Sequence, residues 1–170
     1  MEYICSDTNV WLDFSAVGRT HLPFRLPYTY IMNSDAIEDE VLSPEGLGRE
    51  LVELGLQPVD ITIEECLYAE DLGRMYKQLS RYDRIALAIA KKRSIILLTG
   101  DKALRKAALT EGVSLMGTIG LLDQLWTEGR IEQEEYQGCL KAWLDQQTYG
   151  RRLPKNELLE RLRGLEYRNS

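Results

Sequence analysis

Short apolar runs alternate with stretches of helical apolar spacing along the first 128 residues. The apolar runs predict five strands, near residues 3–6, 28–32, 58–63, 94–98 and 113–116. Apolar residues three and four positions apart predict the helices between them, near residues 10–22, 37–42, 43–54, 64–79, 84–92, 102–109 and 119–126. This alternation predicts an α/β/α sandwich around a central parallel sheet of about five strands.

The pattern changes after Gly129, where two amphipathic segments follow with no strand between them. They predict helices over residues 131–147 and 153–163. We therefore expect a domain over residues 1–128 and a C-terminal helical extension over residues 129–170. The apolar residues of the extension are more typical of packing than of a ligand site, either on the domain or at a dimer contact. These residues are Leu140, Trp143, Leu144, Leu153, Leu158, Leu159 and Leu162.

Composition limits the classes of protein that fit. The 170 residues, 44% hydrophobic and 28% charged, are enough for a globular domain with a real core. The net charge of −6 argues against a simple nucleic-acid coat protein. Eight Lys or Arg residues nevertheless gather between residues 81 and 106. They are either a solvated face of two helices or a local phosphate-binding rim.

Cysteine and histidine usage points away from zinc. Cys5, Cys66 and Cys139 lie far apart, and His21 is the single histidine. Scattered free thiols are typical of a reducing compartment, so we expect a cytoplasmic protein. The polar Glu2 and the lack of an apolar segment after it do not fit a signal peptide, and no run of about 20 apolar residues predicts a membrane span.

Four acidic residues are the candidates for chemistry. Asp7 and Asp101 each follow a predicted strand, Asp83 lies near the start of a predicted helix, and Glu40 lies within one. Ligands of open parallel sheets bind beyond the carboxyl ends of the strands, near the point where the strand order reverses. Asp7 and Asp101 would therefore face one crevice if their strands are neighbours.

Crowded carboxylates repel one another, so that at least one would hold a proton at a raised pKa unless a cation is present. Oxygen-only ligands suit Mg²⁺ or Mn²⁺. Such an ion can make bound water more acidic and can stabilise charge on a phosphate.

Each of these acids also has an ordinary structural explanation. Asp7, Asp83 and Asp101 could cap helices, and Glu40 could be one of several surface acids on its helix. The argument for a site therefore rests on the whole set occurring together.

The ordered motifs resemble those of a PIN domain, a family of metal-dependent ribonucleases. The resemblance covers roughly residues 1–128 and is carried by residues 7–9, 35–42, 83–90, 97–104 and 113–122. It implies a five-stranded parallel sheet, an acidic Mg²⁺ or Mn²⁺ site, and hydrolysis of RNA phosphodiesters. The acids matching the family motifs, and so implied to be catalytic metal ligands, are Asp7, Glu40, Asp83 and Asp101.

Many bacterial PIN domains are toxins of the VapC-like group, usually dimeric and silenced by a small antitoxin. The resemblance thus implies RNA as substrate, and a homodimer and an antitoxin as partners. We expect Lys102, Arg84 and Arg81 to hold RNA phosphates. Thr8, Asn9 and Thr99 are further candidates at the site, either as turn residues or as groups that orient a metal-bound water, and we also expect Asn9 and Thr99 to contact the substrate.

Two other functional classes compete with the nuclease. The first is a PIN-like binding or assembly module with little catalysis, which would act through its C-terminal helices; the acidic net charge and the extension favour it. The second is a phosphatase or receiver-type protein, which requires a second acid beside the first-strand aspartate or a nucleophilic aspartate at another strand. Thr8, Asn9 and Val10 follow Asp7, so the second class fits poorly.

Overall fold

One parallel sheet of five strands forms the centre of the molecule. The computed structural model describes residues 2–41, 45–146 and 153–169. The strands lie in the order β3-β2-β1-β4-β5, and each pairs in parallel with its neighbour. They are β1 (Glu2–Ser6), β2 (Tyr28–Asn33), β3 (Gln57–Val59), β4 (Ile96–Leu98) and β5 (Leu115–Met116). The predicted α/β class with a central five-stranded parallel sheet is confirmed.

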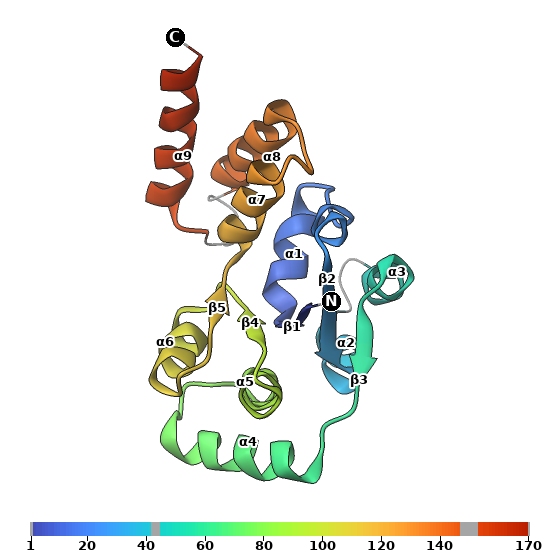
Figure 1. The fold of residues 1–170 in the computed structure, drawn as a ribbon. Coiled ribbons are helices and arrows are strands. Elements are labelled where there is room, and N and C mark those ends of the chain that lie inside the picture. The colour runs from blue at the N-terminus through green and yellow to red at the C-terminus, as the bar shows by residue number, and fades with distance from the viewer. Residues whose placement is uncertain (1, 42–44, 147–152, 170) are drawn as a thin grey trace.

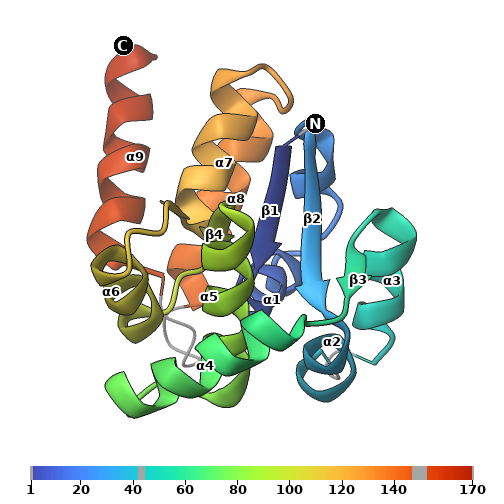
Figure 2. The same cartoon turned by 60° about the horizontal axis from the view of Figure 1, so that its bottom comes forward.

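Helices cover both faces of this sheet (Figure 1). Successive strand residues point to opposite faces, so Ile4 and Leu98 enter one hydrophobic cluster whereas Cys5 and Leu97 enter the other. The first face carries α1 (Thr8–Ala16), α7 (Thr118–Thr127) and α8 (Gln133–Asp145). The second carries α4 (Ile63–Met75), α5 (Arg81–Arg93) and α6 (Lys102–Thr110). Figure 2 shows α4 and α5 lying together across that second face.

The remaining helices are α2 (Ser34–Glu40), α3 (Leu47–Leu54) and α9 (Lys155–Arg168), with a 3₁₀ turn, η1, at Leu22–Arg25. Asn33 begins α2 because its side chain accepts a hydrogen bond from the Ala36 N–H at 3.2 Å. Gly55 ends α3 at a φ of +128°, which a glycine adopts without strain. Across the described ranges, every helix is too short or too polar to cross a lipid bilayer.

Several predicted elements have different bounds in the structure, and two of these differences have a clear local cause. The helix expected over residues 10–22 begins at Thr8 and ends at Ala16, because Gly18 turns the chain at a φ of +67°. The strand expected over residues 58–63 stops at Val59, because Thr62 and Glu65 form a capping box that begins α4. The predicted helix start at residue 43 and the predicted helix end at residue 147 lie outside the described residues.

The C-terminal helices pack on the sheet-bearing region and share its core. The Trp143 ring on α8 meets the Phe14 ring edge-on, with centroids 5.3 Å apart, and its Nε1 donates to the Asp13 carbonyl at 2.9 Å. Arg161 on α9 pairs with Asp123 on α7 at 2.8 Å. Of the two packing alternatives for the extension, the structure therefore shows the contact with the domain.

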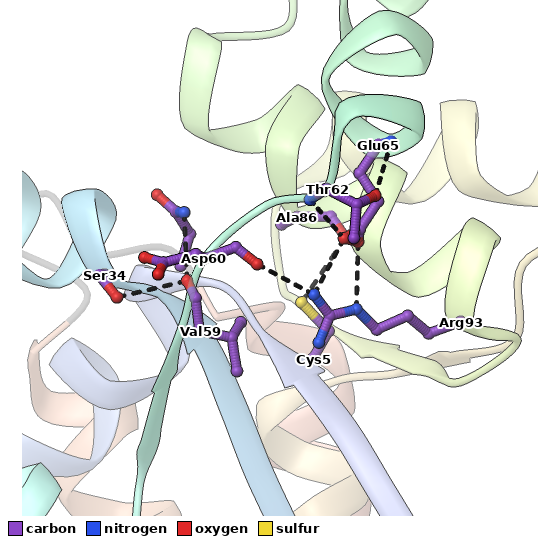
Figure 3. A network of polar contacts seen from close by, with 9 residues as sticks. Cys5, Ser34, Val59, Asp60, Thr62, Glu65, Ala86 and Arg93 are labelled. Carbon is purple, nitrogen blue, oxygen red and sulfur yellow. Dashed lines mark hydrogen bonds and ion pairs between the residues drawn. The ribbon is translucent and has the colours of Figure 1, made fainter.

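A buried ion pair ties α4 to the end of α5 (Figure 3). Glu65 is 1% exposed, and both of its carboxylate oxygens accept hydrogen bonds from Arg93, at 2.9 and 3.1 Å. Arg93 also donates to the Asp60 carbonyl at 3.1 Å. Burial raises the pKa of the Glu65 carboxyl, but the hydrogen bonds from Arg93 and Thr62 outweigh it and hold the pKa below its usual value.

We expect Arg93→Met to lower the free energy of unfolding by about 3 kcal/mol, because the Glu65 carboxylate would stay buried without its guanidinium. Urea denaturation would measure the loss. Arg74→Met is the matched control: its pair with Asp71 is exposed and should contribute less than about 1 kcal/mol. Equal losses in the two variants would contradict this account of the buried pair.

Candidate functional site

The carboxyl ends of β1 and β4 lie side by side at the centre of the sheet. Ser6 pairs with Leu98, and the Asp7 N–H donates to the Leu98 carbonyl at 2.9 Å. Beyond β1 the strand order reverses, from β2 and β3 on one side to β4 and β5 on the other. Asp7 and Asp101, which follow these two neighbouring strands, thus stand at the edge where open α/β sheets bind ligands.

Asp7 is the most deeply buried of the four acids, with 5% of its surface exposed. Its Oδ1 accepts from the Thr8 N–H at 2.8 Å and its Oδ2 from the Thr99 hydroxyl at 2.9 Å. Burial, and then the charge of Asp83, raise its pKa to about 7, and Glu40 adds to the rise against the two hydrogen bonds. The ionised form of Asp7 is therefore disfavoured at this position, as expected for crowded carboxylates.

Asp83 is the third residue of α5 and belongs to a capping box with Ser80. Its Oδ2 accepts from the Ser80 N–H at 3.0 Å, and its own N–H donates to the Ser80 hydroxyl at 3.1 Å. The helix therefore starts at Arg81, earlier than predicted, and Ser80 is its cap. Burial raises the pKa of Asp83, and the nearby charge of Asp101 raises it further.

Asp101 caps α6, because its Oδ1 accepts from the Leu104 N–H at 2.8 Å. Its own N–H donates to the Thr99 hydroxyl at 3.1 Å, and that hydroxyl donates to Asp7. Thr99 is fully buried and so links the two aspartates that follow β1 and β4. Glu40 is the last residue of α2, half-buried, and close enough for its charge to act on Asp7.

The structural and functional explanations of these acids thus coexist. Three of them serve helix starts, yet the charges of Asp83 and Glu40 act on Asp7, and that of Asp101 acts on Asp83. In the part of the chain that the structure describes, no three acidic, histidine or cysteine side chains stand as a ligand set for a metal ion. The all-oxygen donors and the buried, charge-crowded Asp7 suit Mg²⁺ or Mn²⁺ chemically. Binding would need side-chain movements, or bridging waters of the kind that Mg²⁺ retains.

A family model described as a PIN domain matches residues 3–166. The chain belongs to the PIN domain family. The match includes the C-terminal helices as well as the sheet. Neither the curated proteins nor the solved structures contain a significant match to the chain. PIN domains are generally nucleases that act on nucleic acids and typically use divalent metals, so the fold is of a nuclease type.

The basic residues expected to hold phosphates differ in their availability at the PIN site. Lys102 is exposed at the start of α6, directly after Asp101, and Arg81 is exposed at the start of α5. Arg84 is engaged elsewhere: its Nε donates to the Ser80 carbonyl at 3.2 Å, and its guanidinium lies against Gly73 of α4. Asn9 is exposed in the first turn of α1.

Three further basic residues lie at the opposite end of the 13-residue α5 and make local contacts. Lys91 donates to the Glu111 carbonyl at 2.5 Å, Lys92 lies 5.0 Å from the centroid of the Tyr68 ring, and Arg93 pairs with Glu65. The basic residues of α5 are therefore divided between an end that makes structural contacts and the end that carries Asp83.

Sequence reasoning missed Asn33 and Tyr82 as neighbours of Asp7. A cavity of about 10 Å³, room for a single water, is lined by Ser6, Asp7, Thr8, Met32, Asn33, Ala36, Tyr82 and Ala86. Asn33 is a polar residue at the end of a strand, so the signal that singled out Asp7 could also have found it. Tyr82 has no comparable signal. A larger cavity of about 540 Å³ lies at the amino ends of β1 and β4 and includes none of the four acids.

Proposed function

We propose that the protein is a divalent-metal-dependent endoribonuclease that hydrolyses RNA phosphodiesters. The observation that carries this proposal is the state of Asp7. It is a buried carboxyl with its pKa raised to about 7, beside the charges of Asp83 and Glu40, where the strand order of a PIN-family sheet reverses. A nearby cation would remove the conflict between these charges.

Asp7, Glu40, Asp83 and Asp101 would hold the ion, directly or through water. A bound Mg²⁺ or Mn²⁺ supplies a more acidic water and stabilisation of negative charge on the phosphate. The chain supplies the orientation: the Thr8 N–H and the Thr99 hydroxyl fix both oxygens of Asp7. Full burial favours this orienting role for Thr99 over a contact with substrate.

The exposed residues beside these acids would contact the RNA substrate. Lys102 follows Asp101 and Arg81 lies two residues before Asp83, so both cations stand near the proposed position of a phosphate. Asn9, two residues after Asp7, is available from α1. Because Arg84 is held by Ser80 and packs on α4, it contributes to RNA binding only if it leaves those contacts.

Calorimetry with Mn²⁺ separates the nuclease from a PIN-like binding module. We expect saturable binding by the wild type and a dissociation constant raised at least about 10-fold in Asp101→Asn, which loses a ligand charge but keeps an oxygen for the Leu104 N–H. Asp71→Asn, at an exposed acid of α4, is the matched control and should bind like wild type. No binding by the wild type would favour the module, in which the acids only cap helices and the C-terminal helices contact a partner.

We propose the toxin role as the finer form of this function, with cytoplasmic RNA as substrate, a small antitoxin as inhibitor and a homodimer as the assembled form. The family supports it through the VapC-like toxins among its members. A small gene encoded directly upstream would support the pairing, and light scattering of the purified chain at monomer mass would exclude the homodimer.

A further inference from the structure

We infer that Tyr82 is a positioning residue of the acidic site, whose hydrogen bond to Asp39 holds α2 against α5 and thereby keeps Glu40 within reach of the ion bound by Asp7 and Asp83. This inference rests on the proposed metal-dependent function. It assigns Tyr82 a role in the geometry of the site and does not make Tyr82 a metal ligand.

The Tyr82 hydroxyl donates to Asp39 Oδ2 and so joins α5 to α2. Each partner of this bond is next in sequence to a proposed ligand, since Asp39 precedes Glu40 and Tyr82 precedes Asp83. The Tyr82 ring is half-buried and forms part of the wall of the small cavity that contains Asp7. The bond therefore joins the two helices at the point where both present an acid.

The end of α2 has few other means of holding its position. The helix has seven residues, a length that is marginal without external contacts. Its last turn contains Glu38, Asp39 and Glu40 and no basic residue, although a helix C-terminus disfavours negative charge. Among the described residues, the bond to Tyr82 is the only hydrogen bond made by the side chains of residues 35–40.

The other anchors of α2 are apolar or lie at its start. Asn33 caps the first turn, and Ala36 and Val41 are buried. Ala36 shares the wall of the small cavity with Tyr82 and Ala86 of α5, but only the hydroxyl of Tyr82 forms a polar bond between the two helices among the interactions of residues 35–40. Groups hydrogen-bonded directly to a metal ligand typically account for a 10–100-fold difference in metal affinity, and because Tyr82 acts one step further out, through Asp39, we expect an effect at the lower end of that range.

Tyr82→Phe tests the inference because it removes the hydroxyl and keeps the ring, the cavity wall and the contact with Arg81. We expect the Mn²⁺ dissociation constant to rise about 10-fold. In metal-free protein, the backbone amides of α2 should exchange hydrogen faster while those of α4 stay unchanged. Tyr76→Phe is the matched control: it removes a hydroxyl that donates to Glu111 on the other side of α5, and should leave Mn²⁺ affinity unchanged.

Two variants of Asp39 separate the hydrogen bond from the charge. Asp39→Asn loses the charge but keeps an oxygen acceptor for Tyr82, whereas Asp39→Ala loses both. We expect Asp39→Ala to bind Mn²⁺ more weakly than Asp39→Asn, and Tyr82→Phe to add nothing to Asp39→Ala, because the two changes remove one interaction.

The outcomes distinguish this inference from the proposed function. If the wild type binds Mn²⁺ and Tyr82→Phe binds it with the same affinity, the positioning role is overturned and the proposed nuclease function is unaffected. A fully additive effect of Tyr82→Phe and Asp39→Ala would also overturn it. Absence of Mn²⁺ binding in the wild type would reject the proposed function, and the positioning role with it.

Discussion

Asp7→Asn is expected to reduce metal-dependent RNA cleavage by about 10²–10³-fold or more, because it removes a charge on which the proposed site depends. Asparagine fits the same position: its Oδ1 can accept from the Thr8 N–H, and its amide can donate to the Thr99 hydroxyl oxygen. The variant should therefore stay folded. Cleavage of a labelled single-stranded RNA with Mn²⁺ measures the effect, with Asp71→Asn as the control. Wild-type rates in Asp7→Asn would contradict the mechanism.

The same variant should show a distinct stability profile against pH in the absence of metal. The pKa of Asp7 is raised from 3.8 to about 7 in the fold, so this carboxyl favours the folded state below pH 4, and the benefit is lost as pH rises through 7. Asparagine does not titrate. The stability of Asp7→Asn relative to wild type should thus grow between pH 4 and pH 8, by at most about 4 kcal/mol. Urea denaturation in EDTA that gives a constant difference would contradict the crowding of charge at Asp7.

Trp143→Ala should lower the free energy of unfolding by about 3–5 kcal/mol, the largest stability effect we predict. Trp143 is 3% exposed, packs edge-on against Phe14 and donates to the Asp13 carbonyl. The substitution leaves a cavity between α8 and α1 and removes a donor from a carbonyl between them. Thermal and urea denaturation measure the loss, and Leu109→Ala, at a residue 68% exposed on α6, is the control.

The stability of Trp143→Ala also tests the competing binding module. If the C-terminal helices complete the core of the PIN domain, a large residue removed from their inner face must destabilise the whole chain. A loss below about 1 kcal/mol in Trp143→Ala would mean that the helices are loosely attached. That result would favour a partner as their main contact.

Much of the fold follows from local signals in the sequence. The strand predicted over residues 94–98 became β4, an interior strand between β1 and β5, because a strand buried on both faces needs no polar positions. The position of Asp7 and Asp101 just beyond strands predicted a shared edge on the condition that the two strands are neighbours, and the pairing of β1 with β4 meets that condition. The Thr62 and Glu65 capping box was also present as a local signal, and it corrects the predicted end of the third strand.

The parts that were not predictable depend on how distant elements meet. Nothing near Tyr82 in the sequence indicates that its hydroxyl reaches Asp39, 43 positions earlier, because that contact is set by the placement of α5 against α2. The burial of Thr99 and the turn of Arg84 toward α4 likewise follow from packing around the site. The acids could be found in the sequence by their residue type and position, whereas the neighbours that orient them depend on the tertiary structure.

Anomalous diffraction from crystals of the wild-type protein grown with Mn²⁺ is the most direct test of the claim that the four acids form one metal site. We predict a peak between Asp7 and Asp83, with Glu40 and Asp101 bound to the ion directly or through water. A fully occupied Mn²⁺ at other acids, with no density at the carboxyl ends of β1 and β4, would contradict the claim.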